Sequence, residues 1–171
     1  DEADIALTAY SIRFLNDARE FIEVDPEIIK KAAAWLISQQ RADGSFTKKY
    51  YYETTEDTRR TKLFTAYVAR ILAMRKSENQ SESVAISLQK ALDYLKTRNA
   101  EIDEPYSLAL FGLASLDAGN SEDAEKTAER LEKLAIAEGN TLFWNLETNT
   151  PFYGWGTAGR IETTALVVQL L

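Results

Sequence analysis

The sequence predicts an all-α fold built from antiparallel helical hairpins. An apolar helix recurs four times, and two of the copies begin with Thr-Ala-Tyr; the copies run from Thr8 to Leu15, from Thr65 to Leu72, from Tyr106 to Leu116 and from Thr163 to Leu171. A second, amphipathic helix lies between each copy and the next. The repeating unit is therefore a helical hairpin of roughly 50 residues, a period that is typical of stacked-hairpin architectures.

The amphipathic helix after the first copy is marked by its start signals. Asp25 suits the N-cap position and Pro26 suits the first turn. Residues at helical spacing then predict the stripe that faces the core: Ile28, Ala32, Trp35, Leu36 and Gln39. The helix is expected to end before Gly44.

The later helices differ in how much of their surface is apolar. The helix from Val84 to Lys96 has one apolar stripe, whereas the helix from Glu122 to Glu138 is charged around most of its circumference and should be peripheral. Ser107 to Leu116 is apolar on nearly every side, which predicts a helix enclosed by others. Alternating enclosed and peripheral helices indicate two concentric layers, so we expect a segment of an α/α toroid.

Two long segments, 41–60 and 140–159, interrupt the helical pattern. Each joins a peripheral helix to the enclosed helix after it, so both are expected to emerge at the same end of the array. Their aromatic residues are Phe46, Tyr50, Tyr51, Tyr52, Phe143, Trp144, Phe152, Tyr153 and Trp155. These side chains either pack over the helix ends or form a contact surface for a ligand or another domain, because long loops on a rigid scaffold often carry function.

The amino-acid composition argues against several classes of function. The 171 residues form one domain, 1–171, that is long enough to bury a core. The chain has no cysteine and no histidine, so we predict no catalytic residue, no metal site and no cofactor within it. A net charge of −7 argues against nucleic-acid binding. The sequence has no apolar run long enough for direct membrane insertion.

The two ends of the sequence predict an excerpt from a longer protein. The chain starts at Asp1 without methionine and stops at Leu171 with no capping residue. Because an array of three or four hairpins stays open, its inner helices would lose neighbours. We therefore expect a set of inner apolar side chains to be partly uncovered, or covered by a second copy of the chain: Phe64, Val68, Leu110 and Leu113.

Seven short stretches, taken in order, carry a resemblance that runs from Leu7 to Leu171. They are Thr8 to Leu15, Ile22 to Ile28, Ala34 to Gln40 with Asp43 to Phe46, Thr65 to Val68, Ala91 to Leu95, Tyr106 to Leu110 and Ile161 to Ala165. Together they resemble the thioester domain of the α2-macroglobulin and complement family, as its C-terminal part. The segment from Asn149 to Gly156 and the missing cysteines look more like the bacterial branch of that family.

The resemblance implies a function for the parent protein. In that family, a Cys-Gly-Glu-Gln motif near the start of the domain forms an internal thioester that acylates a target after proteolysis. This chain lacks the motif, so the thioester would lie upstream of Asp1, and the fragment itself would not be an enzyme. The expected partners are proteases or target proteins, other domains of the parent, and a second copy of the fragment. The expected location is extracytoplasmic, either periplasmic or secreted, with a membrane anchor in the parent as a further option.

The same resemblance singles out one loop. Family members that favour hydroxyl targets place a histidine after the Gln-rich turn, and the matching stretch here is Tyr50, Tyr51, Tyr52 and Glu53. These four residues are the candidate thioester-facing loop. The missing histidine implies direct acyl transfer to amines or an inactive bond, and simple packing at the helix ends stays open as an alternative role for the tyrosines.

Other acidic residues invite a functional reading. Glu53, Glu56 and Asp57 could form the carboxylate cluster of a toroid glycosidase, but a solvated acidic loop followed by Arg59 and Arg60 explains them better. Glu162 is expected just before the last apolar helix, where it suits the positive end of the helix dipole. The alternative functions are an α/α toroid enzyme of the terpenoid cyclase or prenyltransferase type, and a non-catalytic helical-repeat scaffold that binds protein.

Overall fold

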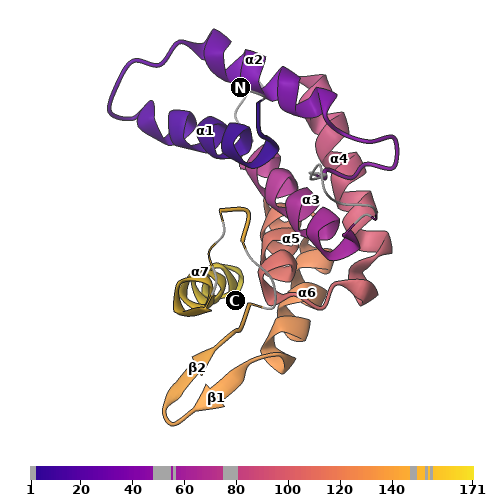
Figure 1. Ribbon diagram of the computed structural model, residues 1–171, viewed down its shortest axis with the longest axis vertical. Coiled ribbons are helices and arrows are strands. Elements are labelled where there is room, and N and C mark those ends of the chain that lie inside the picture. Colours follow the sequence, from indigo (N-terminus) through magenta and orange to yellow (C-terminus); the bar gives the residue numbers. More distant parts are fainter. Residues whose placement is uncertain are drawn as a thin grey trace.

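The computed structural model describes residues 3–47, 55, 57–74, 81–146, 150–152, 154 and 156–171. This part of the chain forms seven α-helices, one short 3-10 helix and two short strands (Figure 1). In chain order they are α1 (Ile5–Ala18), α2 (Pro26–Ser38), α3 (Thr58–Ala73), α4 (Glu82–Thr97), η1 (Asn99–Glu101), α5 (Pro105–Ala118), α6 (Ser121–Lys133), β1 (Ile136–Glu138), β2 (Thr141–Phe143) and α7 (Gly156–Leu170).

The helices are arranged in two layers. The inner layer is α1, α3, α5 and α7, each of which contacts the next in the series. The outer helices α2, α4 and α6 pack on α1, α3 and α5, respectively. The result is a crescent whose hollow side lies between α1 and α7 (Figure 1). The predicted all-α fold, a segment of an α/α toroid, is confirmed.

Local signals set several of the helix boundaries. The Asp25 carboxylate accepts a hydrogen bond from the Glu27 backbone N–H, and Pro26 occupies the first turn of α2, as the sequence predicted. Asp57 caps α3 in the same manner by accepting from the Arg60 N–H. Gly119 ends α5 in the left-handed conformation, which leaves the Asn120 N–H free to bond the Ser115 carbonyl. Asp57 is thus a helix cap, and the other two members of the suggested carboxylate cluster, Glu53 and Glu56, lie outside the described residues.

The core is centred on α3 and α5. Almost every side chain of both helices is buried, including Ser107 to Ser115, so the enclosed helix predicted from composition is confirmed. The expectation that four inner residues would be uncovered is wrong, because Phe64, Val68, Leu110 and Leu113 are all buried. Both helices lie between two inner neighbours, so neither faces an open edge.

Within the inner layer, most of the exposed apolar side chains lie instead on the two end helices. Leu7 and Phe14 on α1 are 58% and 57% exposed, and Ile161 and Val168 on α7 are 65% and 63% exposed. Each of these helices contacts only one inner neighbour among the described elements. The open ends of the layer, rather than its middle, therefore carry the exposed hydrophobic side chains.

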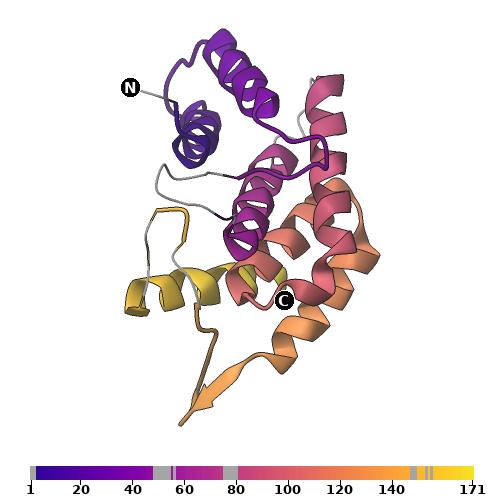
Figure 2. The ribbon, with the colours of Figure 1, turned by 45° about the vertical axis from the view of Figure 1, so that its right-hand side comes forward.

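Two predicted helices differ from the structure. In α2 the predicted core residue Leu36 is buried, but Ile29 and Ala33 are buried in place of the predicted Ile28 and Ala32, and Ile28 is exposed. The helix expected from Glu122 to Glu138 ends at Lys133, and Ile136–Glu138 pairs antiparallel with Thr141–Phe143. A Gly139-Asn140 turn with positive φ at Gly139 favours this hairpin over a continued helix. Figure 2 shows the hairpin projecting away from the helices.

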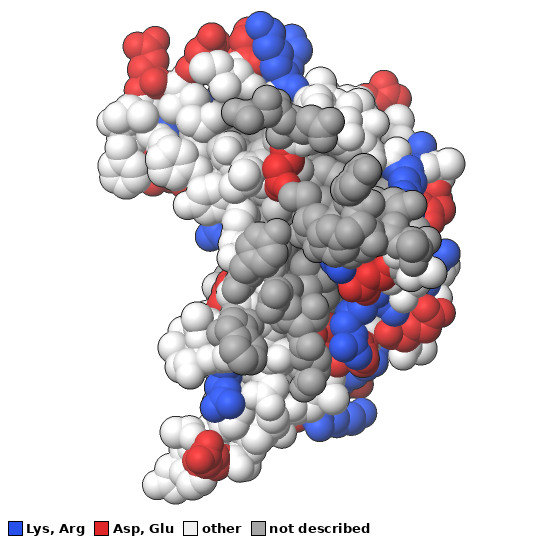
Figure 3. All heavy atoms as spheres, viewed as in Figure 1, with Lys and Arg blue, Asp and Glu red and all other residues white. Residues whose placement is uncertain are grey.

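Charged residues are distributed unevenly over the surface. In the view of Figure 3, Lys, Arg, Asp and Glu gather along the convex side of the crescent, and the hollowed side is mostly uncharged. The outer helix α6, whose only buried side chains are Ala124, Thr127 and Leu131, contributes to the charged side, as expected of a peripheral helix. The concave side is therefore the chemically distinct face of the fold.

Candidate functional site

The four residues of the candidate thioester-facing loop, Tyr50, Tyr51, Tyr52 and Glu53, lie outside the described residues. The structure does describe the segment that leads into this loop and the helix that follows it. Those anchors show how the fold holds the two ends of the candidate thioester-facing loop.

The first anchor is the turn from Gln40 to Ser45. The Gln40 side-chain amide donates hydrogen bonds to the carbonyl oxygens of Gly44 and Ser87, both at 2.9 Å. Gly44 has φ +90° and packs so closely on the backbone of Lys90 that a Cβ atom there would overlap the Lys90 carbonyl oxygen. The turn is thereby fixed to the outer helix α4.

The second anchor joins the start of the loop to α3. The Phe46 backbone N–H donates to the Thr65 hydroxyl at 2.9 Å, and the Thr65 hydroxyl lies 3.2 Å from the Phe46 carbonyl oxygen. The Thr47 and Thr61 hydroxyls are 2.8 Å apart. The Phe46 ring is fully buried, so for this aromatic residue the packing role is the correct one.

Electrostatics also stabilise the first anchor. Although burial acts to raise the pKa of Asp43, hydrogen bonds from the Ser45 hydroxyl and backbone N–H outweigh it, with Arg98 and Arg41 nearby. The pKa of Asp43 therefore lies below its ordinary value of 3.8. Its carboxylate contributes stability that is present above that value and is lost as the pH falls through the lower, folded-state pKa.

We expect Asp43→Ala to destabilise the chain at neutral pH by at most about 1 kcal/mol, because the carboxylate is exposed and screened by solvent. The difference from the unmodified chain should shrink at a pH well below 3.8, where the native carboxyl is protonated as well. Urea unfolding at both pH values measures it. A difference that does not change with pH would show that the Asp43 charge plays no part.

A cleft on the concave face gathers polar and aromatic side chains from all four inner helices. It has a volume of about 170 Å³, and it is lined by Tyr10 and Arg13 of α1, Tyr67, Arg70, Ile71 and Met74 of α3, Tyr106 and Leu110 of α5, Phe152, and Glu162, Leu166 and Gln169 of α7. The cleft lies between the α1 and α7 ends of the crescent (Figure 1). The inner layer thus forms one continuous site.

Glu162 is the acidic group of this cleft. Because α7 begins at Gly156, Glu162 lies in the helix interior and not just before the helix, so the prediction that it interacts with the helix dipole is wrong. Its Oε1 accepts a hydrogen bond from the Tyr106 hydroxyl at 2.9 Å. No lysine or arginine of the described residues lies within ion-pair distance of Glu162.

The tyrosine hydroxyls are held in their neutral form. Burial raises the pKa of Tyr106 well above its ordinary value, and the nearby Glu162 charge adds to the shift. Burial also raises the pKa of Tyr67, with further increases from Glu162 and Tyr10 and an opposing effect from Arg13. Both tyrosines are therefore neutral and do not act as bases; the Tyr106 hydroxyl donates a hydrogen bond to Glu162, and the Tyr67 ring contacts Phe152.

Aromatic contacts connect the two ends of the crescent. The Phe152 ring meets the Tyr10 ring edge to face at a centroid distance of 5.4 Å and the Tyr67 ring at 5.7 Å. Phe152 comes from the segment before α7, whereas Tyr10 and Tyr67 occupy the same place in the two Thr-Ala-Tyr repeats. That repeat was the sequence signal for a shared aromatic surface, but it did not indicate that Glu162 faces it.

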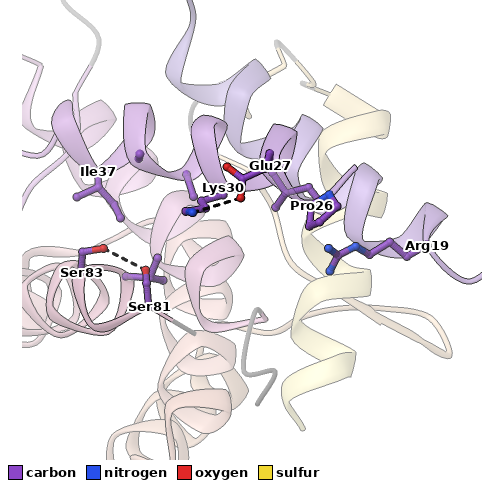
Figure 4. Close-up of a pocket in the computed structure, with 11 residues that line it drawn as sticks. Arg19, Pro26, Glu27, Lys30, Ile37, Ser81 and Ser83 are labelled. Atoms are coloured by element: carbon purple, nitrogen blue, oxygen red, sulfur yellow. Dashed lines mark hydrogen bonds and ion pairs between the residues drawn. The ribbon is translucent and has the colours of Figure 1, made fainter. Parts of the chain in front are cut away.

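A second cavity lies between α2 and the start of α4. Its volume is about 530 Å³, and it is bordered by the Glu27–Lys30 ion pair and by Ser81 and Ser83, whose hydroxyls are 3.0 Å apart (Figure 4). Its lining combines the buried apolar side chains of Ile29, Ala33 and Val84 with exposed polar ones. Among the described residues it contains no converging set of reactive groups.

The part of the chain that the structure describes has no helix that is both long enough and apolar enough to cross a membrane. A two-layer, open arrangement of helical hairpins, with a site on its inner face, defines the class of protein as an α/α toroid. Within that class, the family model of the A-macroglobulin TED domain matches residues 2–170, and the chain belongs to this family.

Two relatives extend this result. The chain is 26% identical over 167 residues to thioester-containing protein 1 allele S1 of Anopheles gambiae, and 27% identical over 166 residues to allele R1 of the same protein. The alignments cover 95% and 94% of this chain but only 12% and 11% of the relatives. The chain thus spans about an eighth of the length of these proteins. Both relatives are from a mosquito, so a bacterial origin stays a prediction.

Proposed function

We propose that this chain is the C-terminal part of a TED domain whose parent acylates target proteins, or traps proteases, through a thioester upstream of the chain. The observation that carries the proposal is the match of the A-macroglobulin TED family over residues 2–170. The names of the mosquito relatives, which are thioester-containing proteins, support it. Because the chain has no cysteine, the thioester sulfur would come from another part of the parent.

In this proposal the chain is a scaffold and not an enzyme. The anchors at Gln40, Gly44 and Phe46 fix the segment that leads into Tyr50, Tyr51, Tyr52 and Glu53. In this proposal those four residues would face the reactive bond. A buried acyl group survives until activation only if water is kept away, and aromatic side chains in that loop would serve this purpose. The chain would need no cofactor.

The absence of histidine from this chain affects whether the thioester of the parent would acylate amines or hydroxyls. An amine nitrogen attacks the thioester carbonyl directly, the carbon–sulfur bond breaks, and the sulfur leaves as a thiolate while the nitrogen loses its proton. A hydroxyl needs a general base or an acyl-imidazole relay for the same reaction. The loop 50–53 has no histidine to form an acyl-imidazole, so the proposed targets are amines such as lysine side chains on proteins outside the cytoplasm.

The proposal is tested on the activated full-length parent by competition between methylamine and glycerol. We expect covalent incorporation of methylamine with release of one thiol, and little incorporation of glycerol. Failure to incorporate either compound, with no thiol released, would overturn the thioester itself. Efficient incorporation of glycerol would overturn only the amine preference, and Phe replacements of Tyr50, Tyr51 and Tyr52, one at a time, would then show whether this loop supplies the relay.

A further inference from the structure

The cavity between α2 and the start of α4 combines an apolar floor with a basic rim. Three buried side chains, between 1% and 3% exposed, form the floor: Ile29, Ala33 and Val84. Further apolar surface comes from other residues of α2: Pro26, Ala34 and Ile37. The volume of about 530 Å³ falls within the range of small-molecule sites, roughly 300–1,000 Å³. The lining can therefore cover an alkyl chain of several carbons.

The cavity is elongated along α2. In the view of Figure 4, Arg19 and Ile37 lie at opposite ends of the labelled lining residues, and Lys30 lies between them. Because an α-helix rises about 1.5 Å per residue, the stretch of α2 from Pro26 to Ile37 follows the cavity for roughly 16 Å. The basic groups are at one end and in the middle, whereas the lining residues at the far end, Ile37 and Ser81 among them, are uncharged.

The charges at the rim favour an anionic head group. Arg19 has no carboxylate within ion-pair distance among the described residues. Lys30 lies 3.2 Å from the Glu27 carboxylate, but both side chains are mostly exposed, so this ion pair is weak. Two basic groups and one acidic group line the cavity, whereas the whole chain has 20 basic and 27 acidic residues. The cavity is therefore a locally positive site on an acidic protein.

The cavity does not depend on how far the toroid extends beyond this chain. Its lining residues all fall within 19–84, and the helices α2 and α4 that border it are consecutive members of the outer layer. These two helices contact each other, and they pack on α1 and α3, respectively. A further hairpin at either open end of the crescent would lie beside α1 and α2 or beside α7. It would not enter the space between α2 and α4.

We propose that this cavity binds a free carboxylate that carries an unbranched alkyl chain, as in the anion of a medium-chain fatty acid. The carboxylate lies at the rim between Arg19 and Lys30, and the chain follows α2 over Ile29 and Ala33. The head group keeps its contact with water, so no charge has to be buried, and the alkyl chain gains free energy by leaving water.

The length of the cavity favours a free alkyl carboxylate over an acidic side chain of a protein partner. An aspartate or glutamate side chain has only one or two methylene groups, so it would leave most of the apolar stretch along α2 uncovered. The proposal goes beyond the thioester function and does not rest on it, because the cavity lies in the outer layer.

The test is an NMR titration of the 171-residue chain with octanoate, observed at the methyl groups of Ile29, Ala33 and Val84. Octanamide and octylamine, which carry the same chain on a neutral or a cationic head group, are the matched control ligands. We expect saturable shifts with octanoate, binding of octanamide that is about tenfold weaker, and weaker binding still of octylamine. Affinity should rise about two- to fourfold per methylene group from butanoate to hexanoate and octanoate.

Four variants separate the contributions of the cavity. Arg19→Gln should weaken octanoate about tenfold and leave octanamide unchanged, whereas Lys133→Gln, the same charge change on the exposed face of α6, should affect neither. Glu27→Gln should strengthen octanoate about threefold, because Lys30 loses a competing carboxylate. Ala34→Phe should abolish binding by filling the cavity, and the fold should be retained because Ala34 is exposed.

Three results would overturn the proposal. The first is the absence of saturable shifts with octanoate. The second is equal affinity for octanoate and octanamide, or unchanged octanoate affinity in Arg19→Gln. The third is binding of N-acetylglutamate methylamide as tightly as octanoate, which would make an acidic side chain of a protein the ligand. If Ala34→Phe does not fold, as judged by its circular dichroism, the titrations of Arg19→Gln and Glu27→Gln still decide the question, because both change exposed side chains.

Discussion

Replacing Gly44 by alanine is expected to destabilise the chain by about 3 kcal/mol or more. Gly44 has φ +90°, a conformation that costs an L-residue about 1–2 kcal/mol. The added Cβ would also overlap the Lys90 carbonyl oxygen, and because that neighbour is backbone in α4 it cannot move aside as a flexible side chain would. Urea-induced unfolding followed by circular dichroism measures the change.

Gly139→Ala is the matched control for this prediction. Gly139 also has positive φ, +58°, but nothing lies within 4 Å of the position that its Cβ would occupy. Only the backbone strain remains there, so we expect a loss of about 1 kcal/mol. Equal losses in the two variants would contradict the proposed contact between the Gln40–Ser45 turn and α4.

Trp144→Ala is expected to destabilise the chain by about 4 kcal/mol. The side chain is only 3% exposed, and its Nε1–H donates to the Leu131 carbonyl oxygen of α6 at 2.7 Å. Alanine would leave a large cavity between β2 and α6 and would remove one of the two donors to the Leu131 carbonyl oxygen, which keeps its hydrogen bond from the Leu134 N–H. Thermal or urea unfolding measures the loss. Of the two roles considered for this tryptophan, the structure supports packing.

Trp144→Phe separates the two contributions. Phenylalanine keeps most of the apolar contact but cannot donate to Leu131, so we expect a smaller loss of about 1–2 kcal/mol. Wild-type stability in both Trp144 variants would mean that the end of the β-hairpin is not attached to α6 through this residue. A loss confined to the hairpin, with α3 and α5 unaffected in hydrogen exchange, would show that the attachment stabilises only the hairpin.

Several features of the fold could be read from local sequence because their causes are local. Asp25 and Pro26 define the start of α2 through one hydrogen bond and one fixed φ angle. Gly119 ends α5 through its left-handed conformation. The composition of Ser107 to Leu116 identified the enclosed helix because no polar face is available for solvent.

Two predictions from the sequence were wrong because the local sequence favours two alternative structures almost equally. Ile28 and Ile29 are adjacent and both apolar, so periodicity alone did not decide which of them faces the core, and packing against α1 and α4 selected Ile29. Ile136 follows a helical pattern, but the pairing of Ile136 with Phe143 across the turn favours a strand. In α2 contacts with distant helices determined the outcome, whereas in the hairpin the Gly139-Asn140 turn and the strand pairing across it did.

The sequence by itself determined the helical class, the order of the hairpins and their division into enclosed and peripheral helices, because these depend on composition and on the 3.6-residue period. Only the tertiary structure decided which apolar side chains stay uncovered, since that depends on which helices lie at the open ends of the inner layer. The hydrogen bond between Tyr106 and Glu162 and the ring contact between Tyr10 and Phe152 also depend on the tertiary structure alone. Such a cleft forms only when helices far apart in the chain pack side by side.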